Sequence, residues 1–190
     1  MYKYFHVILL IGTSVVFGDK FIETPLKYCG PGLPCGDIAI GTPPQTMTVL
    51  FDSGSCHTWI RSVNSGTVFT SVPYDFRESS TYEPLAKTFS ETYAACRISG
   101  RYMKEAITVA QFYCVHFTTQ PVQIGEVMVQ GVILAEAFEQ SGACSQTRPF
   151  DGIFGLCLSS KTPETEPTIF EQLYKHGTFD TAVFSIWFKP

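Results

Sequence analysis

The chain has 190 residues, of which 45% are hydrophobic and 16% are charged, so it can bury a core and is not disordered by composition. Its formal net charge is -4 and it contains no basic run, which argues against a nucleic-acid-binding protein. One compact domain is the simplest expectation for this length.

The N-terminal segment, residues 1–18, places one lysine before a short apolar run and then small residues. This layout predicts a secretory signal peptide, with a signal anchor or a buried strand as the alternatives, because the run is too short to span a bilayer comfortably. No later stretch is apolar enough for a span. We therefore expect a secreted or endolysosomal protein whose mature chain has no integral membrane segment.

The next segment, residues 19–35, is short and rich in Pro and Gly, which predicts a leader or linker. Within it, Cys29 and Cys35 enclose GPGLP, a sequence that could close a small disulfide loop. The chain has seven cysteines, so at least one thiol is expected to be free or intermolecular. The other pairings stay open.

Segments typical of β-strands follow, separated by Ser, Gly and Pro clusters. They are residues 37–40, 46–51, 57–63, 87–93, 101–110, 112–119, 122–138 and 150–158. The first two predict a hairpin that turns at GTPPQ and delivers Asp52 to the end of a strand. The class is therefore mainly β, a sandwich or barrel with one or two helices.

One segment, residues 167–177, has the pattern of a helix. Pro167 stands early and Gly177 is a C-terminal stop. The apolar face is expected to consist of Ile169, Phe170, Leu173 and Tyr174.

The cysteine, histidine and aspartate residues give little indication of a metal site or of a Ser/His/Asp catalytic triad. The chain has no C-x-x-C and its histidines are scattered, so we expect no metal. His57 is expected on a strand surface, since no frame for a Ser/His/Asp triad accompanies it. Asp37, Asp75 and Asp151 are expected to be surface or turn residues, Asp151 through its Asp-Gly pair.

The stretch GDIAIGTPPQTMTVLFDSGSCHTWI, residues 36–60, resembles the first active-site region of the pepsin-like aspartic proteases. The resemblance continues in order through RESSTY at 77–82, TY at 92–93, PFDGIFGL at 149–156 and the segment from residue 167 to the C-terminus. It implies that residues 36–190 form the N-terminal lobe of the bilobal pepsin-like fold. That lobe is a closed or partly open β-barrel with a ψ-loop and one or two short helices.

The resemblance also implies hydrolysis of a polypeptide substrate without a cofactor, and it implies roles for individual residues in that reaction. Such hydrolysis without a metal needs one carboxylate to take a proton from water and one carboxyl group to donate a proton to the substrate. Asp52 is the implied catalytic residue, and the turn that follows it, Ser53, Gly54 and Ser55, would orient its carboxylate. Tyr93 would lie on a flap that covers the substrate, with Trp59 packed beneath it. A structural ψ-loop behind Asp52 would consist of Gly152, Ile153, Phe154 and Gly155.

Three departures from the family pattern accompany the resemblance. The second Asp-Thr/Ser-Gly motif is absent, so we expect one lobe of a longer product, an inactive lobe that binds peptide or another ligand, or a protomer completing the pair by dimerisation. The flap tip has Ala94 and Cys96 where the family has glycines, which predicts altered geometry there. Cys56, beside the turn, is expected to be a small core residue or a redox-sensitive thiol.

Overall fold

A computed structural model describes residues 5–8, 20–65, 72–93, 96–113, 122–142, 149–157 and 166–187. Most of the expected strand at 112–119 lies outside the described residues, as do the flap-tip residue Ala94, Cys114 and Cys144. Within the described part, the class expected from the sequence, mainly β with short helices, is confirmed.

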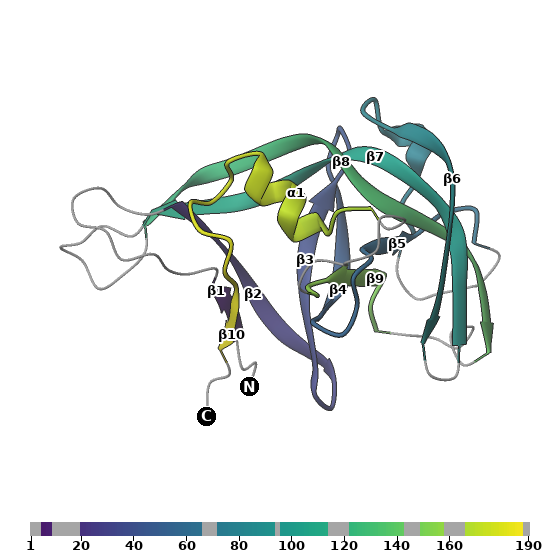
Figure 1. The fold of residues 1–190 in the computed structure, drawn as a ribbon, viewed down its shortest axis with the longest axis horizontal. Coiled ribbons are helices and arrows are strands. Elements are labelled where there is room, and N and C mark those ends of the chain that lie inside the picture. The colour runs from purple at the N-terminus through teal and green to yellow at the C-terminus, as the bar shows by residue number, and fades with distance from the viewer. Residues whose placement is uncertain are drawn as a thin grey trace.

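Ten strands of the described chain form one sheet in the order β10-β1-β2-β3-β4-β9-β5-β8-β7-β6. Their bounds are β1 Phe5–Ile8, β2 Lys20–Gly30, β3 Leu33–Ile40, β4 Gln45–Asp52, β5 Trp59–Arg61, β6 Glu83–Tyr93, β7 Cys96–Tyr113, β8 Val122–Gly142, β9 Gly152–Gly155 and β10 Ser185–Trp187. Additional pairings of β7 with β2 and β3 curl the sheet toward a barrel. Figure 1 shows the long β7–β8 hairpin arching over β3 and β4.

The β3–β4 hairpin forms as predicted and positions the strand that ends at Asp52. Its two strands pair in register from Cys35 opposite Leu50 to Ile40 opposite Gln45. Apolar residues alternate along both strands, and their side chains are buried at Ile38, Ile40, Met47, Val49 and Phe51. Since alternate side chains of a strand share a face, this pattern fixes which face of the hairpin meets the core.

Residues 20–30, expected as part of a linker, instead form strand β2. Ile22 and Leu26 are buried on it, at the even spacing of a strand face. The period-two pattern therefore decides the conformation, although Pro and Gly in the segment suggested a loop.

The N-terminal neighbour β1 pairs with β2 and β10, as Figure 1 shows, and falls inside the predicted signal peptide. The signal peptide stays a prediction.

The predicted helix is α1, Ile169–Lys175. Thr168 and Glu171 form a capping box at its N-terminus, and Gly177 follows its end with φ of 69°. The expected apolar face is wrong at Tyr174, which is 42% exposed. The buried position is Gln172, whose amide bonds the backbone N–H and C=O of β8 residue Ile133, so the helix is tied to the sheet by a polar side chain.

A short 3₁₀ helix, Phe76–Glu78, precedes β6. Asp75 caps it by accepting a hydrogen bond from the backbone N–H of Arg77, so the turn role expected of Asp75 is confirmed. The adjacent carboxylate and guanidinium also bond directly, and this hydrogen bond lowers the pKa of Asp75.

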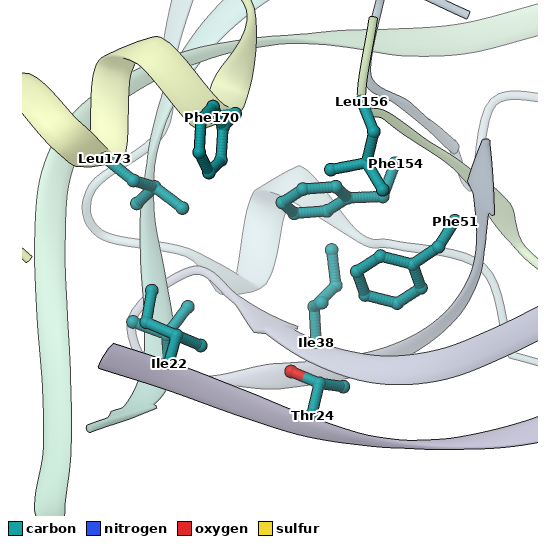
Figure 2. Close-up of a pocket in the computed structure, with 9 residues that line it drawn as sticks. Ile22, Thr24, Ile38, Phe51, Phe154, Leu156, Phe170 and Leu173 are labelled. Carbon is teal, nitrogen blue, oxygen red and sulfur yellow. The ribbon is translucent and has the colours of Figure 1, made fainter. Parts of the chain in front are cut away.

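The core behind the end of β4 is apolar and holds a small cavity. Figure 2 shows Phe51 and Phe154 reaching into it from neighbouring strands while Phe170 and Leu173 of α1 face them. The two strand phenylalanines stack with ring centroids 4.9 Å apart. The cavity has a volume of only about 30 Å³, so apolar side chains pack closely behind the strand that carries Asp52.

Candidate active site

Asp52 ends β4 and lies half-buried, with its carboxylate held by the turn that follows. The backbone N–H of Gly54 donates to Oδ1 at 2.9 Å, and the Ser55 hydroxyl donates to Oδ2. Ser55 is buried, whereas Ser53 is exposed on the turn. Two donors on two different oxygens orient the carboxylate, which is what a group acting in proton transfer requires.

The four residues expected to form a ψ-loop, Gly152–Gly155, form β9, which lies between β4 and β5. β9 runs parallel to β4 with Gly155 opposite Asp52, and antiparallel to β5. The N–H of Leu156 then donates to the backbone C=O of Asp52 at 2.9 Å. A Cβ on Gly155 would lie 2.8 Å from backbone atoms of Ser55, Cys56 and His57, so only glycine allows this approach.

A disulfide between Cys56 and Cys157 joins the residue after the Ser53–Ser55 turn to a cysteine two residues beyond β9. The expectation of a core thiol or redox-sensitive thiol at Cys56 is therefore wrong, because β9 brings a cysteine from 101 residues away to within 4.8 Å, Cα to Cα. The Cys29–Cys35 disulfide is present as the sequence suggested, and Cys96 is disulfide-bonded as well.

Tyr93 and Trp59 meet as the resemblance implied. The indole N–H of Trp59 donates to the Tyr93 hydroxyl at 3.1 Å, and the ring centroids are 6.5 Å apart. Burial raises the pKa of Tyr93, and the negative charges of Glu91 and Asp52 add to this, while hydrogen bonds from Trp59 and Ser55 oppose it. Tyr93 ends β6, the first strand of the predicted flap hairpin, and the charge of Asp52 contributes to the raised pKa of its phenol.

His57 is not the strand-surface residue that the sequence suggested. Its side chain is 14% exposed, and its Nδ1 contacts the carboxylate of Glu91, whose side chain is 32% exposed. Phe89 and Tyr102 pack their rings edgewise against the imidazole. Sequence reasoning missed Glu91; the available signal was its position two residues before Tyr93, which places both side chains on one face of a strand.

Asp151 is a buried structural residue rather than a simple turn former. Its Oδ1 accepts from Arg61 Nη2 at 3.0 Å, and its Oδ2 accepts from the N–H of Thr48 at 3.0 Å. These contacts hold the start of β9 against β4 and β5. By contrast Asp37 is exposed, as expected, and pairs loosely with Lys27.

Among the described residues, no group of three or more His, Cys, Asp or Glu side chains is placed to hold a metal ion. In the same part of the chain, no helix is long and apolar enough to cross a membrane.

Comparison with known proteins gives one consistent family. The family model for eukaryotic aspartyl proteases matches residues 35–120 and 114–190. Cathepsin D of Bos taurus is 31% identical over 156 residues, covering 80% of this chain and 38% of the relative. Aspartic proteinase A2 of Arabidopsis thaliana is 31% identical over 176 residues, 90% of this chain and 31% of the relative.

Oryzasin-1 of Oryza sativa, an aspartic proteinase, is 29% identical over 157 residues, 81% of this chain and 28% of the relative. The chain thus spans well under half the length of these relatives. Its mainly β fold, with β9 between β4 and β5, agrees with one pepsin-like lobe. On the family match and the shared sequence, the chain belongs to the eukaryotic aspartyl protease family.

Proposed function

We propose that this chain is the N-terminal lobe of an aspartic endopeptidase and that Asp52 is one of its two catalytic aspartates. The observation that carries the proposal is the carboxylate of Asp52, oriented by Ser55 and Gly54. Asp52 lies at the end of β4 beside β9, and Tyr93, at the end of β6, is hydrogen-bonded to Trp59 of β5. Family membership supports peptide hydrolysis as the chemistry.

In this mechanism Asp52 and a second aspartate share one proton, because two carboxylates held close cannot both ionise. The ionised carboxylate takes a proton from water, and the water oxygen attacks the carbonyl carbon of the peptide. The protonated carboxyl group gives its proton to the carbonyl oxygen. In the collapse of the tetrahedral intermediate, the carboxyl group that took the proton from water gives it to the leaving amine. The other carboxylate takes a hydroxyl proton of the intermediate, and the C–N bond breaks.

The second aspartate is proposed to come from a second lobe or from a second protomer related by twofold symmetry. The substrate would be an extended polypeptide lying under Tyr93. A secreted or endolysosomal location is proposed with it, since the disulfides of this chain fit an oxidising compartment.

The test is a peptide-cleavage assay on the full-length gene product, with pepstatin as inhibitor. Asp52→Asn should abolish pepstatin-sensitive cleavage, since an amide cannot take the proton from water. Asp37→Asn, at an exposed carboxylate, is the matched control and should keep the activity. Cleavage that survives Asp52→Asn, or peptide binding with no cleavage in the wild type, would refute the catalytic role; sedimentation distinguishes a dimer from a two-lobed chain.

A further inference from the structure

One face of β6 lies on the segment that follows the active-site turn. Along this strand Phe89 is buried and Glu91 and Tyr93 are partly buried, while the intervening Ser90 and Thr92 are exposed. This alternation is that of a strand with one face packed and one face in solvent. The packed face ends at Tyr93, the residue proposed to cover the substrate.

Two polar contacts join this face of β6 to residues 57–59, the segment that follows the turn. The contacting residues are two positions apart in both segments. Glu91 contacts His57 Nδ1, and the Tyr93 hydroxyl accepts from Trp59. The first joins a carboxylate to an imidazole and the second joins two neutral groups. A hydrogen bond that involves an ionised group is about twice as strong as a neutral one, so the Glu91 contact is the stronger anchor.

The surroundings of His57 indicate a role beyond filling space. Its Nε2 is buried and has no hydrogen-bond partner among the described residues. A buried polar atom without a partner lowers stability, and an apolar residue would pack against Phe89 and Tyr102 without that cost. What an apolar residue could not supply is the link from Nδ1 to Glu91.

The backbone on either side of His57 is held in place, so the contact with Glu91 can fix the position of β6. Cys56 is bonded to Cys157, and the Thr58 carbonyl accepts from the N–H of Ala135 at 2.9 Å. Because the turn segment is held to β8 and to the ψ-loop, the imidazole is a fixed point and β6 is the element that it holds.

We propose that His57 and Glu91 are a positioning pair that holds β6 against the active-site turn and thereby sets the place of Tyr93 over Asp52. The pair does not touch the reacting atoms; it acts through Tyr93. The consequence for substrate rests on the proposed function, since only there does Tyr93 serve as the flap residue.

The direct test is hydrogen exchange of the backbone amides at residues 89–93 in the full chain, which needs no catalytic activity. Glu91→Ala should speed their exchange about tenfold, as expected from losing a hydrogen bond to a charged group. Glu91→Gln, which keeps a neutral partner for the imidazole, should give a smaller effect. The matched control is Glu83→Gln, at a glutamate of the same strand. It removes an exposed ion pair with Lys104 of β7 and should leave the exchange of residues 89–93 unchanged.

The backbone amides of α1 and of the β3–β4 hairpin distinguish a local effect from a loss of global stability. In a local effect they should exchange at the wild-type rate. A double-mutant cycle with His57→Gln and Glu91→Ala should show that the two changes together do no more than the Glu91 change alone. Exchange at residues 89–93 that does not differ between Glu91→Ala and Glu83→Gln, or additive effects in the cycle, would overturn the proposal.

In the full-length protein, Glu91→Ala should raise KM for a peptide several-fold and change kcat less, since a displaced flap weakens substrate binding. Glu91→Gln should restore part of the loss. A wild-type protein with no cleavage would refute the proposed function but leave the exchange result to decide the positioning pair. A normal exchange pattern in Glu91→Ala together with normal cleavage would refute the pair and leave the proposed function standing.

Discussion

Arg61 and Asp151 form an ion pair inside the molecule, with Nη2 and Oδ1 3.0 Å apart and both side chains at most 6% exposed. The pair connects β5 to the residue before β9, so it helps to hold β9 in its place between β5 and the strand that ends at Asp52. This buried carboxylate and its guanidinium partner therefore have a structural role.

The first prediction concerns this pair. Asp151→Asn should lower the free energy of unfolding by about 3–5 kcal/mol, because it leaves the buried guanidinium without its countercharge. Asp37→Asn removes one partner of an exposed pair with Lys27 and should change the stability by less than about 1 kcal/mol. Urea denaturation of both variants measures the difference, and equal midpoints would contradict the structural role.

The second prediction concerns the close approach at Gly155. Gly155→Ala should lower the free energy of unfolding by about 1–3 kcal/mol or more, since its Cβ would meet three backbone atoms at 2.8 Å. Gly30→Ala is the control, because there the nearest atom is a flexible Leu33 side-chain carbon at 3.2 Å. Thermal unfolding compares them; a Gly155→Ala protein as stable as the control would mean that β9 does not pass so close to the turn.

The third prediction concerns the Cys56–Cys157 disulfide. Replacing both cysteines by alanine should cost about 4–5 kcal/mol, because the bond closes a loop of 101 residues in the unfolded chain. The same replacement of Cys29 and Cys35, six residues apart, should cost less than about 3 kcal/mol. Denaturant midpoints rank the two variants, and the reverse order would show that chain entropy is not the main effect.

The fourth prediction concerns alkaline pH. Burial raises the pKa of Tyr102 to about 12, and burial together with Glu136 raises that of Tyr82 to about 12. A raised folded-state pKa means that the unfolded chain loses the proton first, so stability is fully present below about pH 10 and falls as pH rises toward 12. Tyr102→Phe should remove part of this fall.

The measurement for that prediction is the urea midpoint across the alkaline range. Tyr174→Phe, at a half-exposed position, is the control and should keep the full dependence of the wild type. An alkaline slope that is the same in the Tyr102→Phe and Tyr174→Phe proteins would contradict the assignment.

Local patterns in the sequence determined much of the fold and the main feature of the site. Alternation along 37–51 gave the hairpin and placed Asp52 at its end, because a strand repeats every two residues and needs no distant information. Pro167 near the start and Gly177 at the stop did the same for the helix, which the structure has at Ile169–Lys175. The family resemblance added the meeting of Tyr93 with Trp59, which no local pattern specifies.

Tertiary structure alone decided which distant residues became partners. Cys56 pairs with a cysteine 101 residues away, Arg61 with an aspartate 90 residues away, and His57 with a glutamate 34 residues away. Periodicity and turn chemistry describe neighbours along the chain, so they do not specify these pairs. The first two pairs form because the sheet order places β9 between β4 and β5, and the third because β6 packs its Phe89–Tyr93 face on the segment after the Asp52 turn.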